Sequence, residues 1–296
     1  MFFHSILSSS QIVQQLKQLA IQFPDFTQLR FEGLSEEERS IYSLTLGRGN
    51  KTLICTGGVH GRESINPTVL VEMIKVYCDN YTTSPQQYPW NYLQTYKILF
   101  IPLLNPDGYE IALRGRSDSG AEIKNQPLAR EWKYNARGVD INRNFPCQSY
   151  RKQDSSDRPF SAVESRILAN IFQREASIGY IDFHSRGQEI FWYRAALDAA
   201  YNERQKKIAE ALESVCHYRI GTPQDEQTDA YSGGNTVQYY SEQYRLPAIT
   251  METVPEEAEF PLSPHWLEIT YEEIQKIPLC FIDCIHTSDI SGNQKG

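Results

Sequence analysis

Thr56-Gly57-Gly58-Val59-His60-Gly61-Arg62-Glu63 is the stretch of sequence that decides the fold. An apolar run at residues 52–55 precedes it and predicts a buried strand. The two glycines let the backbone turn sharply where that strand ends. Pro67 then opens a predicted helix, because proline is tolerated in the first helical turn. A strand, a glycine turn and a helix in this order favour an α/β fold.

His60 and Glu63 lie three residues apart on this turn. A histidine and a carboxylate held in this way can supply two of the three protein ligands of a catalytic zinc ion. A His-x-x-Glu pair also occurs by chance, and a surface turn with a solvated ion pair is the alternative explanation. The residues at later strand ends decide between the two.

Composition limits the class of protein. The chain has 296 residues, 40% of them hydrophobic, with no repeat or linker-like shift in composition, so we expect a single domain over residues 1–296. A net charge of −8 disfavours binding to nucleic acid or to acidic membranes. We find no run of about 18 apolar residues, no signal-peptide pattern and no disulfide spacing among the six cysteines. These features predict a cytoplasmic protein with no membrane or nucleic-acid partner.

Predicted strands alternate with predicted helices along the chain. We expect residues 40–46 and 51–56 to pair across the glycine-containing turn at 47–50. Asn105-Pro106-Asp107-Gly108 predicts a turn, and residues 114–135 predict a long surface loop. The alternation predicts an α/β sheet with helices on both faces. Further strands are expected at 97–104, 178–183 and 247–251, and helices at 5–20, 67–77, 162–176, 198–216, after Gly234, and at 266–286 with a bend at Pro278.

Chemically active side chains follow the predicted strands at their carboxyl ends, where open α/β sheets place their sites. His184 follows the strand at 178–183, and Glu252 follows the strand at 247–251. Together with His60 and Glu63, His184 completes a two-histidine, one-carboxylate set that leaves one zinc position for water. Zinc lowers the pKa of such a water to about 7. Glu252 is then the predicted general base.

Gly138-Val139-Asp140-Ile141-Asn142-Arg143-Asn144-Phe145 lies between these strands in the sequence. Asp140 can accept a hydrogen bond from the non-ligating nitrogen of His60 and so orient the ring. Asn142 and Arg143 supply an amide and a guanidinium group, which together suit a bidentate clamp on a substrate carboxylate. Taken singly, Asp140 could also cap a turn and Arg143 could form a structural ion pair.

In order and context, these stretches resemble the zinc carboxypeptidase family over roughly residues 28–255. The resemblance implies a single domain with a mixed, twisted eight-stranded sheet, on which the helices at 5–20 and 266–286 pack. It also implies one Zn²⁺ per chain. By position it assigns zinc ligation to His60, Glu63 and His184, the general base to Glu252, and recognition of the substrate carboxylate to Asn142 and Arg143.

Two positions depart from the pattern of the digestive family members. Where they have an arginine after a tryptophan, to polarise the scissile carbonyl, this chain has Trp132-Lys133, with Arg130 and Arg137 as substitutes. Where they have a tyrosine before Ser-Gly-Gly, this chain has Asp229, and Tyr231 could replace it only with a shifted loop. The group that stabilises the oxyanion therefore stays open between these residues.

The segments at 132–138 and 184–193 resemble the bacterial branch of the family, whose members cleave γ-D-glutamyl-diaminopimelate bonds in murein peptides. Thr236, small and polar, occupies the position that tunes the leaving-residue pocket in digestive members. Three alternatives remain: an ordinary carboxypeptidase on α-linked peptides, an N-acyl amino acid deacylase, and a peptide-binding module without activity. The expected partner is a peptide with a free carboxylate, and the oligomeric state stays open.

Overall fold

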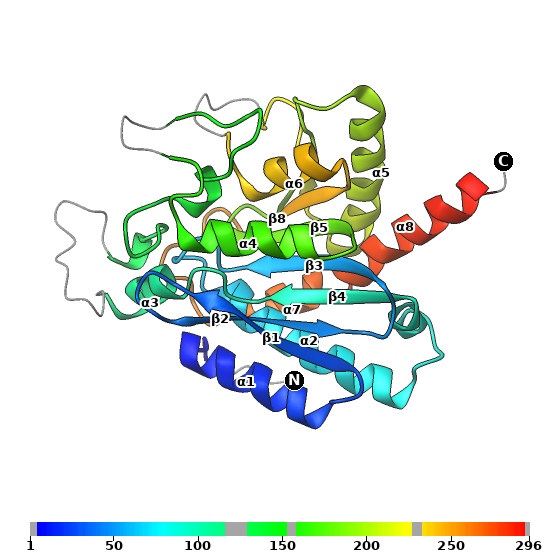
Figure 1. The fold of residues 1–296 in the computed structure, drawn as a ribbon, viewed down its shortest axis with the longest axis horizontal. Helices are drawn as coiled ribbons and strands as arrows, with labels where there is room; N and C mark the ends of the chain where they lie inside the picture. Colours follow the sequence, from blue (N-terminus) through cyan, green and yellow to red (C-terminus); the bar gives the residue numbers. More distant parts are fainter. Residues whose placement is uncertain (1–4, 116–128, 153–157, 227–232, 294–296) are drawn as a thin grey trace.

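The computed structural model describes residues 5–115, 129–152, 158–226 and 233–293. In this part of the chain, one eight-stranded sheet is flanked by helices on both faces (Figure 1). The strands are β1 Thr27–Leu34, β2 Ser40–Leu46, β3 Lys51–Gly57, β4 Tyr96–Ile101, β5 Ser177–Ser185, β6 Glu189–Phe191, β7 Arg219–Ile220 and β8 Ala248–Thr253. The α-helices are α1 Ser9–Gln22, α2 Ile65–Thr83, α3 Pro106–Arg114, α4 Val163–Arg174, α5 Ala199–Cys216, α6 Thr236–Tyr244, α7 Trp266–Ile274 and α8 Ile277–Asn293.

The strands are ordered β1-β2-β4-β3-β5-β8-β6-β7 across the sheet. The four central strands β4, β3, β5 and β8 run parallel. At one edge β2 and β1 are antiparallel additions, and at the other edge β6 runs antiparallel to β8. The mixed eight-stranded sheet implied by the sequence resemblance is therefore confirmed. The carboxyl ends of β3, β5 and β8, three neighbours, meet at the same edge of the sheet.

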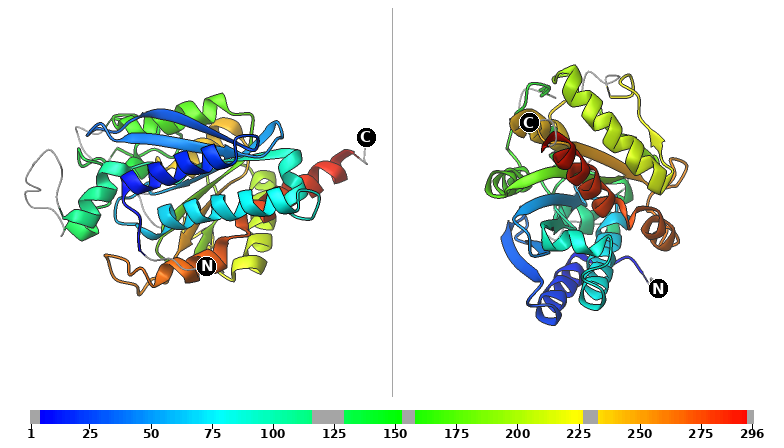
Figure 2. Two further views of the ribbon diagram at one scale, coloured as in Figure 1. Left: turned by 90° about the horizontal axis from the view of Figure 1, so that it is seen from below. Right: turned by 90° about the vertical axis from the view of Figure 1, so that its right-hand side faces the viewer.

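Alternate residues of the central strands face opposite sides of the sheet. In β3, Leu53 and Cys55 pack in the core that includes α1, α2, α5, α7 and α8, whereas Ile54 packs in the core that includes α4 and α6. Figures 1 and 2 show α1 and α2 side by side on one face of the sheet and α4 on the other. Strands buried on both faces explain why their sequences are almost continuously apolar.

The expected pairing of residues 40–46 with 51–56 is wrong, because β4 lies between β2 and β3. The glycines between them serve a close approach to the start of β4, not a hairpin turn. A Cβ atom on Gly49 would lie 1.9 Å from the carbonyl oxygen of Thr95, and one on Gly47 would lie 2.5 Å from that of Tyr96. Local turn chemistry cannot reveal a strand inserted from a later part of the chain.

Other boundaries also differ from the expectations. Asn105-Pro106-Asp107-Gly108 starts α3 and is not a free turn; Asn105 caps this helix by accepting a hydrogen bond from the backbone N–H of Gly108. The helix expected at 266–286 is two helices, and Pro278 sits in the first turn of the second, where proline is tolerated. The first helix begins at Ser9, not residue 5. Among the described residues, no helix is both long and apolar enough to span a bilayer.

Candidate metal centre

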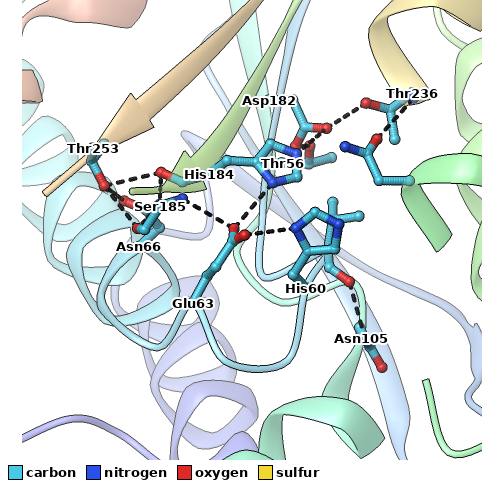
Figure 3. Close-up of polar contacts among 12 residues, drawn as sticks. Thr56, His60, Glu63, Asn66, Asn105, Asp182, His184, Ser185, Thr236 and Thr253 are labelled. Carbon is cyan, nitrogen blue, oxygen red and sulfur yellow. Dashed lines mark hydrogen bonds and ion pairs between the residues drawn. The ribbon is translucent and has the colours of Figure 1, made fainter. Parts of the chain in front are cut away.

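The two histidines and the glutamate predicted as ligands converge at the carboxyl ends of β3 and β5. The Nδ1 atom of His60 lies 2.6 Å from Oε1 of Glu63, and Nδ1 of His184 lies 3.0 Å from Oε2 of the same carboxylate. One ligand atom from each of the three residues lies within 4.8 Å of the other two. Residues 121 positions apart in sequence thus present two nitrogens and a carboxylate to one point, as Figure 3 shows.

The loop that carries His60 and Glu63 is held by close backbone packing. A Cβ atom on Gly61 would lie 2.2 Å from the carbonyl oxygen of Gly108, so no larger residue fits there without a backbone shift. The Asn105 amide donates hydrogen bonds to the carbonyl oxygens of Val59 and Tyr134, at 3.1 Å each. The Asn-Pro-Asp-Gly stretch of the sequence therefore serves to fix the ligand loop.

Each imidazole presents its other nitrogen to a second carboxylate. Nε2 of His60 lies 3.3 Å from Oδ1 of Asp140, as the sequence predicted, and Nε2 of His184 lies 3.0 Å from Oδ2 of Asp182. Carboxylates in this position orient ligand rings and raise their basicity. Both Nδ1 atoms are therefore the ligand atoms, and both rings are directed from behind by an acid.

Sequence reasoning missed Asp182, a fully buried residue. Its Oδ1 accepts a hydrogen bond from the Thr56 hydroxyl at 2.6 Å, and its Oδ2 accepts one from the Thr236 hydroxyl. The signal was present, because residues 182 and 184 are two apart in a strand and must lie on the same face. Thr236, expected in the pocket of the leaving residue, thus uses its hydroxyl to hold Asp182.

A second set of polar side chains supports the ligands from the other side. The Asn66 amide donates to the carbonyl oxygen of His184 at 2.8 Å, and the Thr253 hydroxyl donates to Oδ1 of Asn66 at 2.9 Å. The backbone N–H of Ser185 donates to Oε2 of Glu63 at 3.1 Å. Figure 3 shows Ser185 and Thr253 on one side of the two imidazoles and Thr236 on the other.

The electrostatics of the cluster favour a cation. Burial would lower the pKa of His60 and His184, but the surrounding carboxylates outweigh it and raise both pKa values. Burial would likewise raise the pKa of Glu63, yet the two imidazoles hold it at about 2. Three carboxylates around two histidines thus create a strongly negative, water-poor centre.

Glu252, the predicted base, is the neighbour of His184 in the register between β5 and β8. Burial raises the pKa of its carboxyl to about 8, against the opposing effect of His184. Its Oε2 atom is buried and has no hydrogen-bond partner in the part of the chain that the structure describes. A divalent cation at the neighbouring ligands would stabilise its ionised form and so lower this pKa.

Asn142 and Arg143 form a short 3-10 turn, Ile141–Arg143, which Asp140 caps by accepting the backbone N–H of Asn142. Oδ1 of Asn142 accepts the backbone N–H of Thr236 at 3.1 Å, which leaves its amide nitrogen free to donate. The Arg143 guanidinium donates to the carbonyl oxygen of Asn142, and among the described residues it has no carboxylate in ion-pair range. Both side chains are partly exposed, as recognition of a substrate carboxylate requires.

Of the three cations considered for the oxyanion, only Lys133 lies beside the cluster. Its ammonium group is 2.6 Å from Oδ2 of Asp140. Arg137 pairs with Glu36 at 3.6 Å and is largely exposed, and Arg130 is exposed. Tyr231 and Asp229 lie outside the described residues.

The residues present fit a zinc ion. Two imidazole nitrogens and a carboxylate are the donor set of catalytic zinc sites that keep an open position. Both rings turn the same nitrogen inward and are backed by acids, which is the arrangement expected around zinc-bound histidines. The orphaned buried oxygen of Glu252 faces a centre that no described side chain neutralises.

A buried site of this kind, on the carboxyl edge of a mixed sheet, defines the class of zinc hydrolases that keep one coordination position open. Residues 12–276 match the model of the family described as zinc carboxypeptidase. The chain therefore belongs to the zinc carboxypeptidase family, as the sequence motifs indicated.

Several curated relatives share this region. The chain is 26% identical over 251 residues to the uncharacterized protein YqgT of Bacillus subtilis, covering 77% of this chain and 65% of that protein. It is 28% identical over 184 residues to carboxypeptidase D of Anas platyrhynchos, covering 60% of this chain and 12% of that protein. It is also 28% identical over 216 residues to the inactive metallocarboxypeptidase ECM14 of Ajellomyces capsulatus, covering 64% and 34%. The chain thus spans less than two thirds of the length of each.

Solved structures show the same fold. Bovine thrombin-activatable fibrinolysis inhibitor, in complex with a tick carboxypeptidase inhibitor, superposes with a TM-score of 0.77 at 18% identity, covering 96% of this chain and 98% of that one. The murein-tripeptide amidase MpaA of Escherichia coli O157 superposes with a TM-score of 0.53 at 16% identity, covering 85% and 91%. At these identities, the likeness concerns the fold alone.

Proposed function

We propose that this protein is a zinc-dependent peptidase that hydrolyses the amide bond next to a C-terminal residue. The observation that carries the proposal is the convergence of His60, Glu63 and His184 within 4.8 Å, with the buried carboxylate of Glu252 beside them in the sheet. Family membership supports the same chemistry.

The bound zinc would polarise the scissile carbonyl and lower the pKa of a water molecule, which is the chemistry that zinc supplies in such sites. Glu252 accepts the proton of that water as general base and then delivers it to the departing amine. The carboxylate of the leaving residue is held by the free amide nitrogen of Asn142 and the guanidinium group of Arg143. Asp140 and Asp182 keep the two imidazoles in place during turnover.

The alternative from a different class is a peptide-binding module without activity, and the relatives named above include proteins described as inactive. Inactive relatives tend to lose a ligand or the base, whereas this chain keeps both histidines, Glu63 and Glu252. The buried and unpartnered carboxylate oxygen of Glu252 also favours an enzyme, because a binding module gains nothing from that desolvation.

The direct test compares the wild-type protein with Glu252→Gln, both loaded with zinc. We expect both to hold about one zinc ion per chain by elemental analysis, and only the wild type to release C-terminal residues, with Glu252→Gln slower by at least about a hundredfold. Full activity in Glu252→Gln would overturn the assignment of the base. Zinc binding without turnover by the wild type, on any acylated amino acid or peptide, would favour the binding module.

For the substrate, we propose γ-D-glutamyl-diaminopimelate in murein peptides. The support is the resemblance of the segments at 132–138 and 184–193 to the bacterial branch of the family, together with the small Thr236 at the leaving-residue position. A cytoplasmic location, also a proposal, would suit the recycling of such peptides. Incubation with L-Ala-γ-D-Glu-diaminopimelate is expected to release diaminopimelate. Rapid cleavage of ordinary peptides without that release would exclude this substrate.

Two further substrates fit the same clamp. An ordinary carboxypeptidase would cleave α-linked peptides, and a deacylase would cleave an N-acyl amino acid; in both, a carboxylate lies near the scissile amide. A panel of murein tripeptides, α-linked dipeptides and N-acetyl amino acids separates the three by their ratios of kcat/KM.

A further inference from the structure

Two arginines beside the metal centre share one aromatic ring. The guanidinium carbon of Arg62 lies 4.7 Å from the ring centroid of Phe260, and that of Arg186 lies 5.2 Å from the same centroid. Arg186 also donates to the carbonyl oxygen of Ala258. The Nε atom of Arg62 is buried and has no hydrogen-bond partner in the described parts of the chain.

Neither arginine has an acidic partner among the residues that the structure describes, although the chain carries 37 acidic residues. Other arginines with little exposure are neutralised: Arg194 pairs with Glu226 at 2.5 Å, and Arg174 pairs with Glu32 at 2.7 Å. Two positive charges against one ring repel each other, and the ring quadrupole offsets only part of that cost. An anion from outside the chain would remove it.

The position of this pair relative to the ligands is defined. Arg62 lies between the ligands His60 and Glu63 in sequence, and Arg186 follows Ser185, whose N–H donates to Glu63. A Cβ atom on the next residue, Gly187, would lie only 3.4 Å from Cβ of Glu252. The arginine pair therefore adjoins both the ligands and the base.

The carboxylate clamp lies on the opposite side. Asn142 is hydrogen-bonded to Thr236, and Figure 3 shows Thr236 on the far side of the imidazoles from Ser185. A peptide whose C-terminal carboxylate is held at the clamp, with its scissile carbonyl at the ligands, runs on toward Ser185. Its acyl side then reaches Arg62 and Arg186.

We propose that Arg62 and Arg186 form a subsite, which we call the arginine pair, that binds a carboxylate on the acyl side of the scissile amide. The inference rests on the proposed peptidase activity and narrows its substrate class to peptides with an acid next to the cleaved bond. Two sources supply such a group: the side chain of an α-linked glutamate, and the α-carboxylate that a γ-linked glutamyl residue keeps beside its side-chain amide.

The test uses two matched pairs of substrates with the same leaving residue. One pair has α-linked glutamate or glutamine before the scissile bond; the other has γ-linked glutamate with its α-carboxylate free or amidated. We expect zinc-loaded wild type to prefer the acid by about tenfold in kcat/KM in at least one pair, because charge-assisted hydrogen bonds are the strong ones. The pair that shows this preference identifies the source, and the preference falls as salt is added.

Variants assign the preference to the arginine pair. Arg62→Gln and Arg186→Gln are each expected to reduce the acid preference severalfold, and the double variant to abolish it, while cleavage of the neutral substrates changes little. Arg204→Gln is the matched control, because Arg204 also stacks on a ring, that of Tyr201 at 5.3 Å, but on α5. It should keep the full preference.

Binding measurements keep the inference separate from the peptidase proposal. Calorimetry on zinc-loaded Glu252→Gln with the same pairs is expected to show the same preference in Kd. If no peptide is cleaved by the wild type but the acids bind more tightly, the peptidase proposal fails and the subsite stands. Equal rates and equal Kd values for acid and amide in both pairs, or an acid preference that survives in the double variant, would overturn the subsite.

Discussion

Nε2 of His184 lies 3.0 Å from Oδ2 of Asp182, a carboxylate that is itself held by the hydroxyl groups of Thr56 and Thr236. Thr236 also donates its backbone N–H to Asn142. One helix terminus therefore supports both a metal ligand and the residue proposed to hold the substrate carboxylate. A shift of α6 would disturb metal affinity and substrate recognition together.

Asp182→Asn should weaken zinc binding about 10- to 100-fold, because an amide cannot orient and polarise the ligand imidazole as a carboxylate does. Competition with a chelator of known affinity measures this directly. Asp140→Asn, behind the other imidazole, serves as the matched variant and should give a loss of the same order. Unchanged affinity in Asp182→Asn would show that the contact is only structural.

Arg143→Gln should reduce kcat/KM for substrates with a free C-terminal carboxylate about tenfold or more, because the lost interaction is charge-assisted. The same variant should hardly change the slow cleavage of amidated substrates. A comparison of the two substrate forms in wild type and variant gives the answer. An equal loss on both forms would rule out the clamp.

Gly61→Ala should lower the free energy of unfolding by about 2 kcal/mol or more, because the added Cβ would lie 2.2 Å from a backbone oxygen that cannot move alone. Zinc affinity should fall with it, since the residue lies between two ligands. Gly115→Ala is the control: its Cβ would meet no atom within 4 Å, so only the cost of a positive φ remains, about 1 kcal/mol. Urea unfolding of both variants tests this, and equal losses would contradict it.

Glu164 makes stability depend on pH. Burial raises the pKa of its carboxyl from 4.5 to about 7, although the Asn135 amide donates to it. Between these two pH values the folded state binds more protons than the unfolded state, so this residue reduces stability as pH rises through that window. Glu164→Gln should therefore stabilise the protein more at pH 8 than at pH 4.5, by up to about 3 kcal/mol. Thermal unfolding at both pH values checks this; a pH-independent difference would contradict it.

The ligands could be predicted because they stand at strand ends, where a short motif and the geometry of parallel sheets act together. His60, Glu63, His184 and Glu252 all follow apolar runs that local sequence identifies. Asp182 was equally visible by strand alternation, but its neighbours Thr56 and Thr236 are distant in sequence, so nothing local marked it as functional.

The pairing of strands could not be predicted from local sequence. β4 is inserted between β2 and β3, and only contacts between distant segments decide this. β1, β6 and β7 were not identified: β6 and β7 have three and two residues, too short for a periodic pattern, and β1 is a largely exposed edge strand. The arginine pair was also missed, because two separate arginines gain meaning only when Phe260 brings them together.

The most direct test of the central claim is a crystal structure of the zinc-loaded protein with diffraction data collected on both sides of the zinc absorption edge. The account predicts one anomalous peak per chain, about 2.0–2.2 Å from Nδ1 of His60, Nδ1 of His184 and a carboxylate oxygen of Glu63. No peak at these three atoms, or a peak held by other residues, would contradict it.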